Sequence, residues 1–202
     1  MESIILASGS LQRQEYFRLM GLPFNIMPSR IDEDYNMDLI PRKITEELAV
    51  RKVKNIIELL RGRMPAWICG ADTAISIDGK IFGKPSSRED AKNMLNIFQD
   101  RDHEVVTAVA LFNGREKSID CRSVVSTVTF SPISDAEIEW YLNTGEWQGV
   151  AGAYKIQGLA SCFVSRITGS YSSIVGLPMH EFYAMLRENG YPYGIPDGEP
   201  TR

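Results

Sequence analysis

The chain has 202 residues, with 44% hydrophobic and 24% charged side chains, as expected of a globular enzyme large enough to build its own core. Its formal net charge of −4 argues against a nucleic acid partner, because proteins that hold a nucleic acid strand carry a basic surplus. The apolar runs are too short for a membrane span, and "MESIILASGS" lacks the basic start of a signal peptide, so we expect no membrane partner and a cytoplasmic location.

The first third of the chain alternates short strands with helices. Hydrophobic spacing and breaker residues predict, in chain order, a strand in "SIILAS", a turn of small residues at 8–10, a helix in "LQRQEYFRLM", a strand in "FNIMPS", an acidic loop in "IDEDYNMDLIPR" and a long helix over 44–60. The order strand, small-residue turn and helix, at the very start, is one that suits anion binding.

The rest of the chain predicts longer strands and more helices. In order, these are a strand or strand pair in "AWICGADTAISI", a hairpin turn at 78–79 before "KIFG", a helix from Ser87, two antiparallel strands in "HEVVTAVALF" and "RSVVSTVTF", a helix capped by Ser134 and Glu137, a glycine-rich loop in "GEWQGVAGAYKIQG", a strand in "CFVSRI" and a last helix from Pro178. We therefore predict an α/β protein with a mixed sheet flanked by helices, one domain over 1–190 and a Pro/Gly-rich tail over 191–202.

The three cysteines, Cys69, Cys121 and Cys162, form no disulfide framework by their number, which is odd. All three lie in apolar runs of the sequence. We expect buried thiols in a reducing compartment.

The turn in "LASGS" is a candidate anion site. Ser8, Gly9 and Ser10 would expose backbone N–H groups at the start of a helix, and Arg13 lies one turn further along. The alternative is that Ser10 only caps the helix.

Two acidic residues are candidates for chemistry. Asp72 lies in a run that should be buried, where an ionised carboxylate needs a cationic partner or a bound cation. A structural pair with a lysine would explain it equally well. Glu33, in "RIDED", is ordinary by itself, but two carboxylates from separate segments would suit Mg²⁺ or Mn²⁺.

The neighbouring sequence suggests a different role for each of three polar residues, Lys52, Lys84 and Gln157. Lys52 has Arg51 and Lys54 close by in sequence, so a solvated helix face is its default interpretation. Lys84 stands between a glycine and a proline, which fixes its backbone and favours a phosphate-binding role. Gln157, in a loop bracketed by glycines, offers an amide that could read a base edge. The chain has neither a P-loop nor a dinucleotide fingerprint.

Seven segments in this order resemble the Maf family of nucleoside triphosphate pyrophosphatases, also called septum formation inhibitors. They are "LASGSLQRQEYFRLMGLPF", "IDED", "LAVRK", "GADTAISIDGKIFGKP", "HEVVTAV", "GEWQGVAGAYKIQG" and "GSYSSIVGLP". The resemblance implies a strongly twisted sheet like that of inosine triphosphate pyrophosphatases, with a cleft between two lobes. It also implies hydrolysis of a nucleoside triphosphate to the monophosphate and pyrophosphate, a divalent metal and a homodimer.

The same resemblance implies roles for individual residues. Asp72 would be the proton acceptor and, with Glu33, a metal ligand. The residues implied in substrate binding are Ser8, Gly9, Ser10, Arg13, Lys52, Lys84 and Gln157.

Substrate choice within the family is linked to the positions of Gln12, Thr73 and Gln157. Thr73 and Gln157 match the branch that acts on dTTP and UTP, whereas the branch that prefers 7-methyl-GTP carries Gln and Glu there. Gln12 departs from the common S-P-R-R pattern of the phosphate loop, and Val150 replaces a common lysine.

The resulting hypothesis explains the acid within the strand. Asp72 and Glu33 would hold a metal or orient the attacking water, while Arg13, Lys52 and Lys84 neutralise the polyphosphate. The hairpin at 78–79 would bring Lys84 back towards Asp72. Two alternatives remain open at this point: hydrolysis of modified nucleotides such as 7-methyl-GTP or inosine triphosphate, and a nucleotide-binding regulator of cell division.

Overall fold

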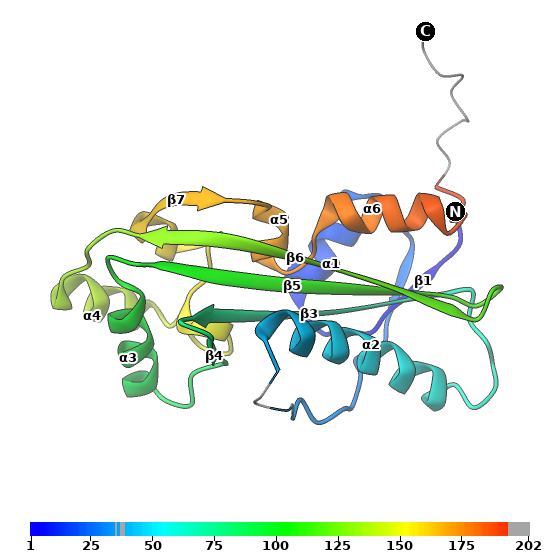
Figure 1. Ribbon diagram of the computed structural model, residues 1–202, viewed down its shortest axis with the longest axis horizontal. Helices are drawn as coiled ribbons and strands as arrows, with labels where there is room; N and C mark the ends of the chain where they lie inside the picture. The colour runs from blue at the N-terminus through cyan, green and yellow to red at the C-terminus, as the bar shows by residue number, and fades with distance from the viewer. Residues whose placement is uncertain (35, 37–38, 194–202) are drawn as a thin grey trace, which may run out of the picture.

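An eleven-residue strand, β3 (Trp67–Ile77), is the axis of the fold in the computed structural model, which describes residues 1–34, 36 and 39–193 (Figure 1). Along one edge β3 pairs with β5 (Asp102–Asn113), which in turn pairs with β6 (Ser118–Phe130), and both of these pairings are antiparallel. The sheet has seven strands in the order β2-β1-β3-β5-β6-β7, with β4 added to β3.

The remaining elements cover the sheet or extend its edges. They are β1 (Ile4–Leu6), α1 (Leu11–Leu19), β2 (Phe24–Ile26), α2 (Pro41–Leu59), β4 (Lys80–Phe82), α3 (Arg88–Phe98), α4 (Asp135–Thr144), 3-10 turns at Ala151–Ala153 and Leu159–Phe163, β7 (Val164–Thr168), α5 (Tyr171–Val175) and α6 (Met179–Glu188). Strand β1 is parallel to both β2 and β3, so the sheet is mixed, as the sequence predicts.

Alternation along β3 distributes its side chains between two apolar layers. Trp67, Cys69 and Ala71 pack on one face, in a core completed by α1 and α6. Ile68 packs on the other face, against α2. A strand covered on both faces reads as a continuous apolar run, which is why "AWICGADTAISI" shows no polar alternation. It is one strand, not the pair that the sequence left open.

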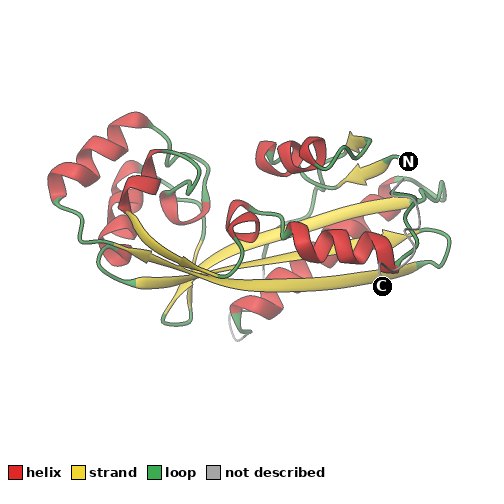
Figure 2. Cartoon of the chain, turned by 90° about the horizontal axis from the view of Figure 1, so that it is seen from above, coloured by secondary structure: helices red, strands yellow, loops and turns green. Residues whose placement is uncertain are grey.

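The far end of the sheet has its own core. There the ends of β3, β5 and β6 meet β4, α3, α4 and the two 3-10 turns in a third apolar cluster. Figure 2 shows the long strands running from one group of helices to the other. The molecule therefore has two lobes joined by continuous strands.

Most sequence-predicted elements are confirmed, with three corrections. The long helix begins at Pro41, not at 44, since a proline at the first helical position is well tolerated. The late strand begins at Val164, because Cys162 lies in a 3-10 turn. Helix α5 has five residues, too few for periodicity to reveal, and was not predicted. The 191–202 tail lies largely outside the described residues, as do positions 35, 37 and 38 of the acidic loop.

The cysteine prediction is wrong in part. Cys69 is buried, but Cys121 is half-buried and Cys162 is exposed. Cys162 lies in an apolar stretch whose 3-10 turn rotates neighbouring side chains to different sides, so local hydrophobicity overstates its burial. Separately, none of the described helices is both long and apolar enough to cross a membrane.

Candidate functional site

A cavity of about 470 Å³ lies beside β3, where one edge of that strand is uncovered. Along this edge β1 pairs with residues 67–69 and β4 with residues 75–77, so among the described strands none covers the stretch between them. Asp72 and Thr73 occupy that gap on opposite faces of β3, and both reach the cavity past the open edge. Asp72, although it lies within an apolar strand, is therefore placed where the edge of β3 is left uncovered between β1 and β4.

Every residue that the sequence or the resemblance singled out for the site lines this one cavity. They are Ser8, Gly9, Ser10, Gln12, Arg13, Glu33, Lys52, Asp72, Thr73, Lys84 and Gln157. Val150, the residue in place of a common lysine, lines it too. The cavity also draws residues from both lobes, which agrees with the predicted cleft.

Lys52 joins the two candidate acids. Its Nζ lies 2.7 Å from Asp72 Oδ1 and 2.8 Å from Glu33 Oε1, and Lys52 and Asp72 are 7% and 8% exposed. The local charges around Lys52 in sequence suggested a solvated face, and that default is wrong. Its side chain lies on the side of α2 that packs on β3, where only the buried carboxylate makes a charge tolerable.

Gly70 makes this approach of α2 possible. A Cβ at Gly70 would lie 2.7 Å from the carbonyl oxygen of Ala49 and 2.9 Å from Val53, so a side chain there would push α2 off the strand. The same contact surface sets Lys52 above Asp72, two residues along β3. The glycine is thus a packing requirement of the ion pair.

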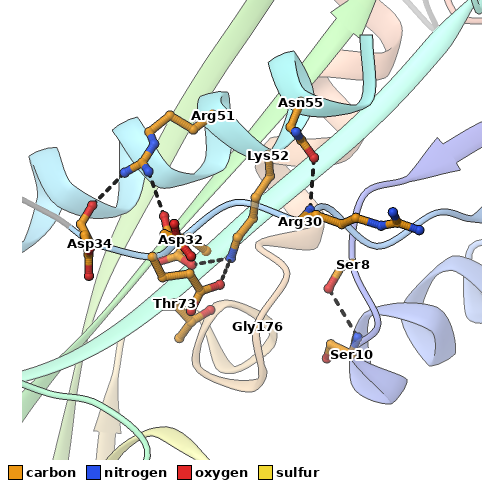
Figure 3. Close-up of polar contacts among 12 residues, drawn as sticks. Ser8, Ser10, Arg30, Asp32, Asp34, Arg51, Lys52, Asn55, Thr73 and Gly176 are labelled. Carbon is orange, nitrogen blue, oxygen red and sulfur yellow. Dashed lines mark hydrogen bonds and ion pairs between the residues drawn. The ribbon is translucent and has the colours of Figure 1, made fainter. Parts of the chain in front are cut away.

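Glu33 reaches the pair from a loop that α2 holds by its backbone. Arg51 Nη1 donates to the carbonyl oxygen of Asp34 at 2.7 Å and Nη2 to that of Asp32 at 2.6 Å (Figure 3). One turn further along α2, Asn55 Oδ1 accepts from the backbone N–H of Arg30 at 2.9 Å. Helix α2 therefore clamps the loop on both sides of Glu33.

The carboxylate of Glu33 is held in its charged form. Partial burial raises its pKa, but the hydrogen bond and charge of Lys52, with the charges of Lys84 and Arg13, outweigh burial and keep the pKa below its ordinary value. Its side chain is 57% exposed, against 11% for that of Asp72. Lys52 therefore pairs with one largely exposed carboxylate and one largely buried carboxylate.

The small-residue turn between β1 and α1 forms the opposite side of the cavity. Ser10 is the N-cap of α1, with its side chain accepting from Arg13 N at 3.5 Å, so the capping interpretation is correct. Ser8 Oγ accepts from Ser10 N at 3.2 Å and from Arg13 Nη1 at 3.0 Å. Capping is compatible with anion binding here, because the cap accepts from one N–H group and the start of a helix presents several.

Arg13 is buried and held from three segments. Besides its bond to Ser8, Nε donates to the carbonyl oxygen of Gly176 at 2.8 Å, and Nη2 donates to Thr73 Oγ1 at 3.2 Å. Burial lowers the pKa of Arg13, and the charge of Asp72 opposes that shift. An arginine stays protonated at neutral pH, and its guanidinium has further N–H groups beyond these contacts.

Lys84 and Gln157 lie at the exposed rim. The β3–β4 hairpin pairs Ile75 with Phe82, so the chain that follows returns Lys84 alongside the Asp72 region, as the sequence predicted. The glycine-rich loop that carries Gln157 is tied to this hairpin by a bond from Gly152 N to Gly83 O of 2.9 Å. Sequence reasoning missed Lys155, a lysine of this loop that also lines the cavity.

The donor set limits what metal the site could hold. Within the described ranges no group of three or more His, Cys, Asp or Glu side chains forms a protein-only metal cage. Magnesium, however, commonly takes one or two carboxylates and completes its shell with water and substrate phosphate. Glu33 and Asp72 fit that use by the number and kind of their ligand atoms, and the point to which both direct an oxygen is occupied by Lys52 Nζ.

Comparison with known proteins gives consistent results. A family model described as "Maf-like protein" matches residues 3–189. A relative from Symbiobacterium thermophilum, named dTTP/UTP pyrophosphatase, is 40% identical over 95% of this chain and 96% of its own length. Another from Pelotomaculum thermopropionicum, with the same name, is 37% identical over 95% of this chain and 98% of its own.

A solved structure shows a more distant similarity. The nucleoside-triphosphatase, or dITP/XTP pyrophosphatase, of Mycobacterium abscessus aligns at 13% identity and a TM-score of 0.40. The alignment covers 65% of this chain and 74% of that one. A similarity this weak carries no argument about the site.

Proposed function

Since the chain belongs to the family of Maf-like proteins, we propose that it is a pyrophosphatase of nucleoside triphosphates, with dTTP and UTP preferred. The reaction consumes one water and yields the nucleoside monophosphate and pyrophosphate. The observation that carries this proposal is the ion triad in the cavity: Lys52 between Glu33 and Asp72, facing the turn that holds Arg13.

The cations and donors around the cavity suit a polyphosphate. Arg13 and Lys52 are buried within it, Lys84 lies at its rim, and the N-terminus of α1 opens onto it. Ser8 Oγ already accepts two hydrogen bonds, which leaves its own hydrogen to donate to a bound phosphate oxygen. Positioning and charge neutralisation supply most of the catalysis in phosphoryl transfer, so these groups are sufficient in kind.

Asp72 is the proposed proton acceptor. Its Oδ1 accepts from Lys52, so Oδ2 is the oxygen that would orient water against a phosphorus of the α–β linkage and take its proton. The ion pair with Lys52 fixes the direction of this carboxylate. With the α-phosphorus as the atom attacked, its bond to the bridging oxygen breaks as the bond to water oxygen forms, and pyrophosphate leaves towards Arg13 and Lys84.

We also propose a divalent cation, Mg²⁺ or Mn²⁺, held by Glu33 and Asp72. When bound with substrate, it would supply charge neutralisation at the phosphates. The exposed position of Glu33 suits this role, because a loop carboxylate adjusts to an incoming ion more readily than one on the sheet.

The proposed base preference rests on two of the three positions linked to substrate choice, Thr73 and Gln157, and on the names of the relatives, while Gln12 departs from the family pattern. Thr73 and Gln157 match the dTTP/UTP branch, and Gln12 lies beside Ser10, whose Oγ donates to Gln12 Oε1 at 3.1 Å. Gln157 is exposed at the rim, where an amide can meet a base edge. We propose that Gln157 contacts the base directly.

A substrate panel tests the proposal. The protein is incubated with Mg²⁺ and dTTP, UTP, inosine triphosphate or 7-methyl-GTP, and pyrophosphate and monophosphate are measured. Pyrophosphate from dTTP and UTP at the highest rates is the expected result, and loss of activity with a chelator is expected for the metal. Faster turnover of 7-methyl-GTP or inosine triphosphate would favour clean-up of modified nucleotides. Tight nucleotide binding without pyrophosphate release would favour a regulator.

The predicted homodimer and cytoplasmic location remain proposals that rest on the family resemblance and on composition. Sedimentation of the purified protein at several concentrations tests the first, since a dimer sediments with twice the mass of a 22.7 kDa chain. Fractionation of the host cell tests the second.

A further inference from the structure

A line of hydroxyl groups runs from the cavity into the interior behind Arg13. Thr73 on β3 and Thr107 on β5 are cross-strand partners, and their Oγ1 atoms are 2.9 Å apart. Thr107 is completely buried, and its Oγ1 lies 2.6 Å from the carbonyl oxygen of Ser173 in α5. Thr107 does not line the cavity, and neither its sequence motif nor the proposed reaction assigns it a role.

The directions of these hydrogen bonds can be deduced. The carbonyl oxygen of Ser173 can only accept, so the single hydroxyl hydrogen of Thr107 goes to it. Thr107 Oγ1 must then accept from Thr73, whose hydrogen is used in turn. Thr73 Oγ1 therefore meets Arg13 Nη2 with a lone pair, as that donor requires.

Helix α5 holds both ends of this line. Ser173 accepts from Thr107, and Gly176, which follows the helix, accepts from Arg13 Nε at 2.8 Å. The helix is itself anchored to β6, because Ser126 Oγ lies 2.9 Å from Ser173 Oγ and accepts from Ser170 N at 3.0 Å. The segment "GSYSSIVGLP" thus supports the guanidinium from behind.

Building on the proposed function, we propose that Thr107 is a positioning residue for substrate phosphate, acting through Thr73 on the guanidinium of Arg13. With its hydrogen directed inward to Thr107, Thr73 has none to offer a nucleobase. Its effect on substrate choice would then arise from where it holds Arg13, and so from where the polyphosphate and the attached nucleoside come to rest. Buried hydroxyls without side-chain freedom suit this task, since a small displacement of a phosphate ligand is costly for catalysis.

The test compares Thr107→Val, which keeps the shape and removes the hydroxyl, with Thr107→Ser, which keeps the hydroxyl. Thr45→Val is the matched control, because Thr45 is equally buried but donates only to the carbonyl oxygen of Arg42 in its own helix. Pyrophosphate binding is measured by calorimetry, and KM and kcat are measured with dTTP. We expect Thr107→Val to weaken pyrophosphate binding about tenfold and to raise KM more than it lowers kcat, with Thr107→Ser and Thr45→Val within about twofold of wild type.

The decisive arm repeats Thr107→Val in an Arg13→Lys background. A lysine cannot make the forked contacts of Arg13, so the second substitution should change pyrophosphate affinity by less than about twofold there. An equal loss in both backgrounds, or no loss in a folded Thr107→Val protein, would overturn the proposal. Where Thr107→Val does not fold, Thr73→Val takes its place with the same expectations, because it removes the acceptor of Arg13 Nη2 directly.

Binding and turnover separate this inference from the proposed function. If the wild-type protein released no pyrophosphate from dTTP but Thr107→Val still weakened pyrophosphate binding through Arg13, the reaction would be wrong and the positioning role would stand. If the wild-type protein hydrolysed dTTP while Thr107→Val bound pyrophosphate normally, the reaction would stand and the positioning role would not. A wild-type protein that binds no pyrophosphate overturns the positioning role in either case.

Discussion

The two walls of the cavity are built in different ways. The sheet wall carries Asp72 and Thr73 on β3, with Arg13 of α1 bonded to Thr73, and the polar groups of all three bond to other groups beneath the surface. The loop wall carries Glu33, whose side chain is 57% exposed and whose backbone is held by exposed bonds to Arg51. The groups that must keep one direction lie on the sheet, and the group that must admit a substrate lies on the loop.

Burial gives these walls unequal energetic weight. Removing one partner of a buried ion pair costs about 3–5 kcal/mol, whereas exposed pairs contribute roughly 0–1 kcal/mol. Lys52 belongs to both walls, because it pairs with buried Asp72 and with exposed Glu33. Substitutions of buried groups on the sheet wall should therefore cost much more than substitutions of exposed groups on the loop wall.

The largest loss is expected for Asp72→Asn, which keeps the shape of the side chain and removes its charge. Turnover of dTTP should fall by at least about 10³-fold, since the proposed proton acceptor and metal ligand disappears together with the partner of Lys52. Asp78→Asn is the control, because Asp78 lies in the same hairpin but pairs only with exposed Arg101. Near-normal pyrophosphate release by a folded Asp72→Asn protein would remove the sheet wall from the chemistry.

Lys52→Met should be the next most damaging change. It leaves two carboxylates facing each other without their cation, and we expect a loss of roughly 3 kcal/mol in the free energy of unfolding and about 10²-fold in turnover. Added Mn²⁺ or Mg²⁺ should raise its Tm more than that of the wild-type protein, since the metal would take the place of the ammonium. Lys54→Met, exposed on the same helix, is the control. A Tm unmoved by either metal would argue against Glu33 and Asp72 as a cation site.

A smaller, purely kinetic effect is expected for Arg51→Gln. The variant loses both bonds to the backbone around Glu33, so the loop wall should loosen while the sheet wall stays intact. We expect KM for dTTP to rise by about three- to tenfold with kcat within about threefold, as for a group that helps to admit substrate. Lys54→Gln removes the same charge from the same helix without touching the loop. A large fall in kcat with unchanged KM would mean that the walls do not divide the work in this way.

The sequence revealed the sheet wall better than its supports. Asp72 in an apolar run and Lys84 beyond a hairpin turn are both visible because strand and turn patterns are local. The charged neighbours of Lys52 along the chain wrongly indicated a solvated face. Only the packing of α2 against Gly70 places Lys52 in the cavity lining. Thr107 could not have been singled out, because its importance depends on cross-strand register and on a carbonyl group far away in the chain.

One buried anchor ties the glycine-rich loop of the cavity to the sheet. Tyr154, which lines the cavity, has its hydroxyl 2.7 Å from His103 Nε2, and the His103 ring stacks on Phe98 with centroids 4.7 Å apart. Burial lowers the pKa of His103 from 6.5 to about 4, with the charge of Asp102 opposing the shift. The folded protein therefore holds this imidazole neutral, whereas the unfolded chain protonates it at its ordinary pKa.

The smallest effect on activity is expected at that anchor, whose contribution appears as a pH dependence of stability. Because the folded pKa lies below the unfolded one, the stabilisation is complete above about pH 6.5 and is lost as the pH falls towards about 4, to a limit of about 3 kcal/mol. Urea unfolding of His103→Gln between these limits should lack this part of the slope, although the variant is less stable near pH 7. His180→Gln, at the exposed second histidine, should retain it. Equal slopes in wild type and His103→Gln would show that carboxylates alone set the acid response, and that the glycine-rich loop has no titratable anchor.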